Sequence, residues 1–445
     1  MVGISVDSEL AIRNTDTVKA RYADGVGLGS TFLHHIFKAA DVIQINEECE
    51  TAYQYIVENY TPQFEIWMFG LSRGAYIVRA VAGMINNCGI IRPTRDRDGN
   101  IDRTITTMRC RRVYQIYRSR EEWASPQSHD MKDFRTRNSY NIRTPVKFMG
   151  LFDTVGSLGI PKPIGGEGFV WPDGFHDKNI SSVVEKVYHA VSLHDRLTAF
   201  QPCLVNRSVR SRTDPNLEIH QKWFPGTHYD LCRQKFKFFR VGASFLEIVA
   251  ALPLNLLSGT VQPNTVLSDL VLKWMLESIK HEDPDGLVIP NINNEIQVVI
   301  DRIRRGENVG SGDVYDHLLH YIPFGHVFHA AYWFWSYVGL GFLPSFARGI
   351  TTEHFETFFG INLIKRIFAC KDRLVTERKA DVYHYRDPDY SLGGLCIRDL
   401  AVVNGGRYPS KTYENFLVYQ LDMDLIGTEG FAARFEERGS GWTLD

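Results

Sequence analysis

The hydrophobic pattern of this 445-residue chain is most regular between residues 65 and 89. Four consecutive apolar residues, 66–69, fit a buried strand and are too few for a helix. After a turn, apolar residues recur at helical spacing from Ala75 until Asn87 and Gly89, which are typical stop signals. The pattern therefore predicts a strand, a tight turn and a helix within this stretch.

The same alternation continues along the chain. Strand-like apolar runs lie within residues 145–159 and 218–230, and each leads into a turn that contains glycine. Helical patterns occur over 39–60, 185–197 and 267–279. In the last of these, Ser268 is the expected N-cap. Alternating strands and helices indicate an α/β fold with a doubly wound, mostly parallel sheet.

Residues 92–147 interrupt this pattern, because arginines crowd a stretch that also carries Asp and Glu. One interpretation is a solvated helical excursion above the sheet. The other is a helical cap whose guanidinium groups dock an anionic head group such as phosphate, since the arginine fork matches two phosphate oxygens. Either interpretation adds a helical insertion to the fold.

Composition narrows the class of protein. The hydrophobic share of 44% and the charged share of 23% are typical of a soluble globular protein. The net charge of −2 gives no general attraction to nucleic acid, so no nucleic-acid partner is expected. Seven cysteines occur without a C-x-x-C pair, and the N-terminus lacks the apolar core of a secretory signal. We therefore expect an intracellular, reducing location, most simply the cytoplasm.

The turn after the first predicted strand reads G-x-S-x-G, residues 70–74, and places Ser72 between a strand and a helix. This is the nucleophile elbow arrangement of α/β-hydrolases, in which glycines avoid collisions between the neighbouring strand and helix. Asp153 follows the second strand-like run, and His228 follows the third on a glycine turn. Serine, aspartate and histidine in this order predict a catalytic triad.

Each residue of this set has a chemical role. A serine hydroxyl is a weak nucleophile until a base takes its proton, and the imidazole of His228 can accept that proton and pass it to the leaving group. Asp153 would fix the imidazole tautomer and stabilise the imidazolium. The backbone N–H of Arg73, directly after Ser72, is the expected oxyanion donor. Asp195 is the alternative acid.

Other stretches leave alternatives open. The glycine-rich residues 23–31 form either a plain turn near the active-site face or a loop that cradles a nucleotide phosphate, although no convincing strand precedes them. Asp230, two residues beyond His228, either orders the loop or joins the triad. Residues 317–329 hold four histidines, but no carboxylate or cysteine lies among them. We therefore expect neither a metal site nor a cofactor.

Residues 321–347 contain no Asp, Glu, Lys or Arg and are rich in aromatic side chains. Their length suits a membrane span, but two prolines and several glycines argue against a clean spanning helix. A buried or lid-forming segment is the second interpretation. The third is peripheral membrane contact through Tyr332, Trp333 and Trp335.

Five blocks of sequence resemble the successive motifs of the DUF2235 family. The blocks are G-L-S-R-G-A at 70–75, L-F-D-T-V-G-S-L-G at 151–159, H-A-V-S-L-H-D-R at 189–196, W-F-P-G-T-H-Y-D at 223–230 and W-M-L-E at 274–277. This is a family of α/β-hydrolase-like proteins related to type VI secretion phospholipase effectors. The chain is most similar to its fungal branch, also through Y-A-D-G-V-G at 22–27. The resemblance implies esterase or phospholipase-type activity, with Ser72, Asp153 and His228 at the matching triad positions.

The resemblance also implies an apolar strand ending in a D-G-T-type turn, which would supply the first sheet strand and a second oxyanion donor. No such strand precedes Tyr22, so we expect a chain that is truncated at its N-terminus relative to the family. Residues 1–280 are expected to form the hydrolase-like domain, and 281–445 a mostly helical C-terminal extension. The leading hypothesis is hydrolysis of a carboxylic ester, preferably of a lipid or phospholipid. The alternative is a catalytically impaired scaffold or membrane-associated protein with an incomplete oxyanion hole.

Overall fold

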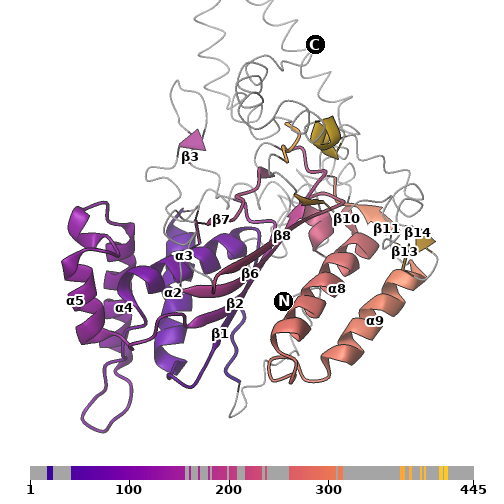
Figure 1. Ribbon diagram of the computed structural model, residues 1–445. Helices are drawn as coiled ribbons and strands as arrows, with labels where there is room; N and C mark the ends of the chain where they lie inside the picture. Colours follow the sequence, from indigo (N-terminus) through magenta and orange to yellow (C-terminus); the bar gives the residue numbers. More distant parts are fainter. Residues whose placement is uncertain are drawn as a thin grey trace, which may run out of the picture.

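A computed structural model shows a central parallel sheet with helices on both of its faces (Figure 1). The structure describes residues 18–23, 42–155, 183–197, 200–207, 216–232, 260–306, 309–313, 371–375, 380–382, 410–413 and 415–418. It also describes two-residue strands at 160–161, 169–170, 179–180, 236–237, 391–392 and 395–396.

In the described part of the chain, the central sheet has five parallel strands, and their order across the sheet follows their order along the chain. The strands are β1 (Ile66–Leu71), β2 (Val146–Phe152), β6 (Val184–Ser192), β8 (Glu218–Phe224) and β12 (Asp381–Val382). Because the strands run in the same direction, their carboxyl ends meet at one edge of the sheet, where open α/β folds bind their ligands. The predicted α/β class with a mostly parallel sheet is confirmed.

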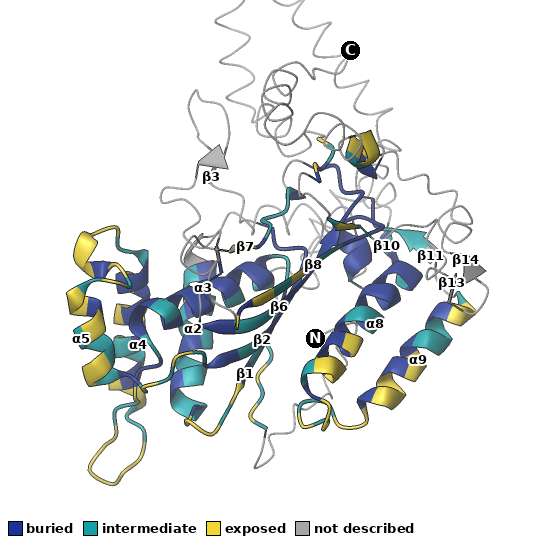
Figure 2. Cartoon of the chain, viewed as in Figure 1, coloured by how far each residue is buried: buried dark blue, intermediate teal, exposed yellow. Residues whose placement is uncertain are grey.

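Two hydrophobic cores cover the two faces of the sheet (Figure 2). The first lies under α2 (Val42–Asn59), α3 (Arg73–Cys88) and α4 (Arg103–Arg118). The second lies under α8 (Thr265–Glu282) and α9 (Ile292–Arg305). The middle strands are buried on both sides, since Met149 of β2 belongs to the first core and Phe148 to the second.

The remaining elements are short. The small sheets pair β3 (Ile160–Pro161) with β4 (Phe169–Val170), β5 (Asn179–Ile180) with β7 (Asn206–Arg207), and β13 (Ser391–Leu392) with β14 (Leu395–Cys396). A further sheet places β10 (Thr260–Asn264) between β9 (Phe236–Lys237) and β11 (Val309–Ser311). The other described helices are η1 (Glu122–Ala124), α5 (His129–Asn138) and η4 (His228–Leu231).

The predicted strand, turn and helix around Ser72 are confirmed as β1 and α3, with Ser72 between them. Helix α3 ends at Cys88, and its C-cap Gly89 has a φ of 73°, a positive value that glycine adopts readily. A Cβ on Gly70 would come within 2.4 Å of the Gly74 carbonyl carbon, whereas a Cβ on Gly74 would meet no described atom within 4 Å. The close approach of strand and helix therefore explains Gly70 and not Gly74.

The helix expected over residues 185–197 is wrong, because Val184–Ser192 form β6, the middle strand of the described sheet. All residues from Val187 to Ser192 are buried. A strand that is buried on both faces lacks the alternation of polar and apolar residues by which a half-exposed strand is recognised. The helices that cover both faces of the sheet come from distant parts of the chain, and packing against them therefore determines that this segment is a strand.

The helix expected over residues 267–279 is confirmed as α8, but its predicted N-cap is wrong. The helix begins at Thr265, and Asn264 is the cap, with its side-chain oxygen accepting from the N–H groups of Val266 (3.1 Å) and Leu267 (3.2 Å). Asparagine caps helices about as well as serine, and Asn264, which precedes Ser268 in the chain, is the N-cap. The Ser268 hydroxyl instead donates to the carbonyl of Asp230 at 2.8 Å.

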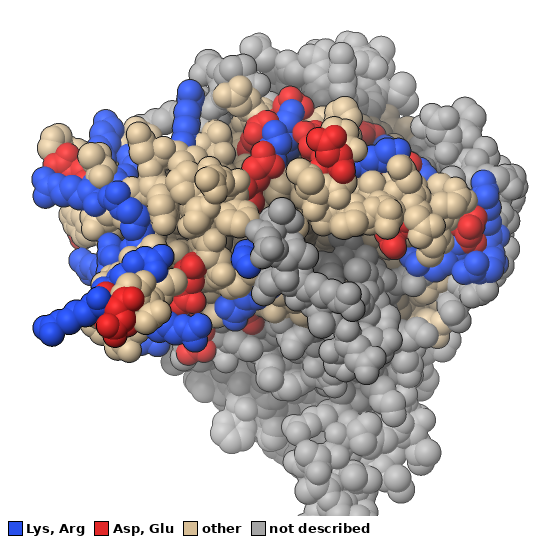
Figure 3. Space-filling model, turned by 90° about the horizontal axis from the view of Figure 1, so that it is seen from below, with Lys and Arg blue, Asp and Glu red and all other residues tan. Residues whose placement is uncertain are grey.

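The helical excursion expected within residues 92–147 is present as α4 and α5. Figure 3 shows basic side chains gathered at this end of the molecule, with acidic side chains among them. Several guanidinium groups here donate to backbone carbonyls, for example Arg109 to Arg92 (3.1 Å) and Arg135 to Asn87 (2.6 Å). Arg109 therefore ties α4 to the preceding loop and Arg135 ties α5 to α3, and docking of an anionic head group stays a prediction.

Segments beyond residue 280 contribute to the sheet and to its helical layers. Helix α9 packs on α8, where Arg302 donates to both carboxylate oxygens of buried Asp269, at 3.1 and 2.9 Å. Strand β12 pairs with β8. The division into residues 1–280 and 281–445 stays a prediction, but these contacts join the two parts closely.

Several predicted features lie outside the described residues. They are most of the glycine-rich loop, the aromatic segment 321–347 with Tyr332, Trp333 and Trp335, the four histidines of 317–329, and residues 1–17, which make up most of the stretch where the family's first strand was sought. Within the described residues, none of the helices has the length and hydropathy needed to cross a membrane.

No disulfide joins the cysteines whose side chains the structure describes: Cys49, Cys88, Cys110, Cys203 and Cys232. Burial raises the pKa of both Cys88 and Cys110 to about 12. These two thiols therefore stay protonated at neutral pH and do not compete with a serine as nucleophile.

We expect Gly70→Ala to destabilise the fold, because the added methyl group would collide with the backbone of Gly74 and Ala75. Overpacking of this kind costs about 1–3 kcal/mol. Gly74→Ala is the matched control, since its methyl group enters open space in a helix and such changes stabilise by about 0.4–1 kcal/mol. Urea unfolding of both variants measures the difference. A Gly70→Ala protein as stable as the wild type would contradict this account of the strand–helix contact.

Candidate active site

Ser72 follows β1 in a strained backbone conformation. Its φ of 56° and ψ of −117° are rare for a residue with a side chain, and such strain persists only when the surrounding structure enforces it. The backbone N–H of Ser72 donates to the carbonyl of Phe152 at 2.8 Å, which continues the β1–β2 pairing past the end of the strand. Ser72 is half-buried, whereas His228, which contacts its hydroxyl, is buried.

Arg73, the predicted oxyanion donor, is the first residue of α3. The N–H groups in the first turn of a helix have no acceptor within the helix, and the positive end of the helix dipole lies there. A negative charge that develops beside Ser72 would therefore meet a favourable field. The side chain of Arg73 is buried, and burial lowers its pKa, against the opposing effects of Glu48 and Tyr229.

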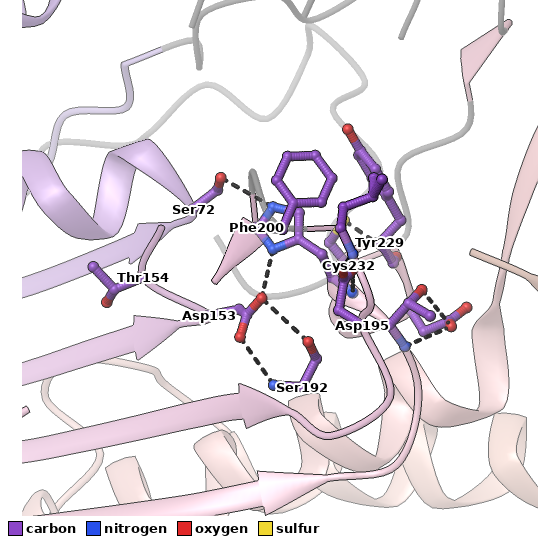
Figure 4. A network of polar contacts seen from close by, with 12 residues as sticks. Ser72, Asp153, Thr154, Ser192, Asp195, Phe200, Tyr229 and Cys232 are labelled. Carbon is purple, nitrogen blue, oxygen red and sulfur yellow. Dashed lines mark hydrogen bonds and ion pairs between the residues drawn. The ribbon is translucent and has the colours of Figure 1, made fainter. Parts of the chain in front are cut away.

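His228 is presented by a tight turn after β8. Gly226 in this turn has a φ of 107°, and a Cβ there would come within 2.8 Å of the Asp230 side chain. The Nε2 atom of His228 lies 3.0 Å from the Ser72 Oγ, and its Nδ1 atom lies 2.6 Å from the Asp153 Oδ2. Figure 4 shows these contacts as one chain from Ser72 through the imidazole to Asp153.

Aromatic rings hold the imidazole plane. The Phe200 ring stacks on it with centroids 4.6 Å apart and an interplanar angle of 28°. The Tyr229 ring meets it edge-on at 5.3 Å. Since both aromatic residues are buried, the imidazole has little freedom to rotate away from Ser72 and Asp153.

Asp153 follows β2 and is completely buried at 0% exposure, with a φ of 42°. Its carboxylate accepts hydrogen bonds from three residues. The donors are His228 Nδ1 (2.6 Å), the Ser192 backbone N–H (3.0 Å), the Ser192 hydroxyl (3.2 Å), and Arg373 Nη1 (2.6 Å) and Nη2 (2.8 Å). Every oxygen of this buried carboxylate is thus paired, as a buried charge requires.

The charge state of Asp153 follows from these neighbours. Burial by itself would raise the pKa of Asp153, but the Arg373 charge and the hydrogen bonds from His228 and Arg373 outweigh it and hold the pKa well below its usual range. Asp153 is therefore an acceptor only, which assigns the hydrogen to Nδ1 of a neutral His228. The Nε2 atom then carries the free lone pair, and it faces the Ser72 hydroxyl.

The other predicted acids have different surroundings. Asp195 accepts from the backbone N–H groups of His228 and Leu197, both at 2.9 Å, so it orients the turn while Asp153 contacts the ring. Burial raises the pKa of Asp195, and the nearby Arg373 and His228 oppose this effect. Asp230 accepts from several backbone N–H groups, including that of Thr227 at 2.9 Å, which fits the loop-ordering role rather than a place in the triad.

Two further histidines of the predicted blocks are structural. His189 accepts from the Thr154 N–H through Nε2 (3.2 Å) and contacts Gln221 through Nδ1 (2.9 Å). His194 accepts from the Gly226 N–H through Nδ1 (2.9 Å). Burial lowers the pKa of each to about 4, so both rings are neutral at physiological pH. Among the described residues, no group of three or more His, Cys, Asp or Glu side chains is placed to hold a metal ion.

The structure brings Ser72, Asp153, His228 and Arg73 together, as the sequence predicts, and adds residues that the sequence analysis missed. These are Ser192 at the end of β6, Phe200 and Arg373. Ser192 lies in the block 189–196, which was the one signal in the sequence that pointed to it. Arg373 lies 220 residues from Asp153 in the chain, in a segment without a recognisable motif.

A family model for the catalytic domain of Tle1-like phospholipase effectors of the type VI secretion system matches residues 9–278. The uncharacterised protein YEL023C of Saccharomyces cerevisiae is 28% identical over 174 residues, which are 38% of this chain and 23% of the yeast protein.

Among solved structures, the Tle1 effector bound to the VgrG spike of the type 6 secretion system has a TM-score of 0.27 and 15% identity, covering 64% of this chain and 63% of that chain. The chain thus spans less than two thirds of the length of either relative. The fold assignment rests on the strand order described above. Because the family model covers more than half of the chain, including β1, β2, β6 and β8, the protein belongs to the family of Tle1-like phospholipase effector catalytic domains.

Proposed function

We propose that this protein is a serine hydrolase that cleaves a carboxylic ester of a lipid, with a phospholipid preferred. The observation that carries the proposal is the hydrogen-bonded chain from Ser72 through His228 to Asp153 at the carboxyl edge of the sheet. Membership of a phospholipase effector family supports a lipid as the substrate class.

The reaction begins with proton transfer. As the Ser72 Oγ attacks the ester carbonyl, its proton passes to Nε2 of His228, and the C–O bond forms as the carbonyl π pair moves to oxygen. The resulting oxyanion is stabilised by the Arg73 N–H and by the positive end of α3. Collapse of this intermediate expels the alcohol, which takes the proton from His228 and leaves an acyl group on Ser72.

Water completes the cycle by the same route in reverse. His228 takes a proton from water as the water oxygen attacks the acyl carbonyl, and then returns it to the Ser72 Oγ as the acid leaves. Asp153 stays ionised throughout and stabilises each imidazolium. Its ionic state does not depend on the reaction, because the depressed pKa of Asp153 keeps it charged well into the acid range.

The lipid part of the proposal extends to the membrane. Residues 321–347 are uncharged and aromatic, so Tyr332, Trp333 and Trp335 are the side chains that we propose for peripheral contact with a bilayer. This part rests on the sequence alone, and it is independent of the chemistry at Ser72.

Ser72 should react with a fluorophosphonate probe, because an activated serine attacks phosphorus as it attacks a carbonyl carbon. We expect labelling of the wild type and none of Ser72→Ala or His228→Ala. Ser278→Ala is the matched control, since this serine lies in α8 and its hydroxyl donates to the Trp274 carbonyl. We expect this variant to be labelled like the wild type. Gel fluorescence of folded proteins measures the outcome.

The labelling experiment also tests the alternative function. A well-folded wild type that does not react would overturn the hydrolase proposal and favour the catalytically impaired scaffold. Labelling that survives in Ser72→Ala would place the reactive nucleophile elsewhere.

Asp153→Asn and Asp195→Asn should separate the two candidate acids. Loss of the carboxylate on Nδ1 disturbs the tautomer, and in a well-studied triad it lowers kcat about 10⁴-fold. We therefore expect Asp153→Asn to lower the labelling rate by about three to four orders of magnitude. Asp195→Asn replaces one of the two side-chain oxygens that accept from backbone N–H groups, so it should cost about 1–3 kcal/mol of stability and slow labelling far less. The opposite ranking of rates would make Asp195 the acid.

Release of free fatty acid from phosphatidylcholine vesicles tests the substrate class. We expect the wild type to release fatty acid and Ser72→Ala to release none, because the acyl-enzyme cannot form without the hydroxyl. A soluble short-chain ester in parallel separates chemistry from lipid specificity. Hydrolysis of the soluble ester without any release from vesicles would refute the lipid assignment and leave the esterase chemistry intact.

A further inference from the structure

Arg373 reaches the site from a part of the chain that the family match does not include, since that match ends at residue 278. Its segment, residues 371–375, is fixed to the loop that follows β6. The Lys371 N–H donates to the Arg196 carbonyl at 2.7 Å, and the Gln201 side chain donates to the Lys371 carbonyl at 2.9 Å. Val375 is buried against Trp223 of β8.

The guanidinium group of Arg373 is completely buried and uses both of its Nη atoms twice. Nη1 donates to the Asp153 Oδ1 (2.6 Å) and to the Ser192 carbonyl (2.7 Å). Nη2 donates to the Asp153 Oδ2 (2.8 Å) and to the carbonyl of Phe200, the residue whose ring stacks on the imidazole. One side chain thus connects the predicted acid to two of the elements that surround the predicted base.

Such a contact is more than a packing interaction. A planar guanidinium binds the two oxygens of a carboxylate side by side, so it fixes the rotation of the Asp153 carboxylate as well as its charge. With Arg373 in place, Oδ2 is aimed at the Nδ1 atom of His228. Lysine has the charge but not the fork, and it could not hold both oxygens in one plane.

We propose that Arg373 is a positioning residue of the hydrolase site, which keeps Asp153 ionised and aimed at His228, so that the catalytic unit extends beyond residue 278 to the segment 371–375. This inference rests on the proposed function, because it assigns Arg373 a role in the reactivity of Ser72. It makes the C-terminal part of the chain a structural requirement of the chemistry.

The charges around Asp153 set the expected pH dependence. The groups that face it are Arg373, His228 of η4, His189 of β6 and Asp195 of the following loop. His189 is neutral, since burial lowers its pKa to about 4, so Arg373 is the permanent positive charge in contact with the carboxylate. Arg373 and Asp153 together carry no net charge, and the imidazole therefore faces a neutral pair.

Removal of Arg373 should raise the pKa of Asp153, because burial then acts on the carboxylate without the opposing charge. The pKa of Asp153 is depressed in the folded protein, so its ionised form survives as the pH falls; without Arg373 that form is lost at a higher pH. Since reactivity needs an ionised Asp153, loss of Arg373 moves the acid limit of reactivity to higher pH.

The test is the rate of fluorophosphonate labelling of the full chain as a function of pH, over the range in which each variant stays folded. For Arg373→Met we expect labelling at neutral pH to slow about tenfold or more, and the acid-side midpoint to rise by about one to three pH units. Arg373→Lys should keep the midpoint near that of the wild type, because it keeps the charge, and should still label more slowly because it lacks the fork.

Arg302→Met is the matched control. It breaks another two-point contact between an arginine and a buried aspartate, Asp269, between helices α8 and α9. We expect this variant to lose stability while its acid-side midpoint stays at the wild-type value. Thermal unfolding recorded beside the labelling separates the loss of stability from the change in pH profile.

A double variant shows whether Arg373 acts through Asp153. Asp153→Asn combined with Arg373→Met should label no more slowly than Asp153→Asn alone, because the second change has no charged carboxylate left to affect. If the double variant instead labels more slowly by the product of the two separate factors, Arg373 does not act through Asp153.

An unchanged midpoint in Arg373→Met, with labelling reduced only in proportion to the unfolded fraction, would overturn the proposal while leaving the hydrolase assignment intact. A wild type that does not label at any pH would overturn both.

Discussion

The buried charge of Asp153 is the constraint on which the site depends. A carboxylate without water is costly unless it is paired and hydrogen-bonded, and here the partners come from three other segments of the chain. Ser192 ends β6, His228 begins η4 after β8, and Arg373 comes from residues 371–375. Satisfying this one charge therefore requires the ends of neighbouring strands and a distant segment to meet at the same point.

The parallel sheet supplies the register that makes this meeting possible. Beyond the strand ends the ladder continues: Ser72 N–H donates to Phe152 at 2.8 Å, and Asp153 N–H donates to Ala190 at 2.7 Å. Ser72 and Asp153 are thus each tied to the next strand by a backbone hydrogen bond. Ser72 and Asp153 both have positive φ, and these bonds help to hold them in conformations that an isolated chain would leave.

Features that depend on local sequence could be predicted, and features that depend on distant packing could not. The turn at Ser72 and the helix after it follow from glycines, apolar spacing and stop signals within a short stretch. Strand β6 was not predictable from its own residues, because burial on both faces removes the alternation that marks a strand. Asn264 shows the same limit on a small scale, since two residues could cap α8 and the fold used the earlier one. Arg373 carries no motif, and only the folded chain brings it to Asp153.

The arrangement has a consequence for the energetics of the proposed reaction. In the resting site Arg373 and Asp153 form a pair without net charge, while His228 and Ser72 are neutral. When Ser72 attacks, a positive imidazolium and a negative oxyanion appear together, so the net charge of the buried site is again zero. Burial then strengthens the attraction between these two new charges without isolating either of them. A lone carboxylate beneath His228, without the Arg373 charge, would be harder to bury.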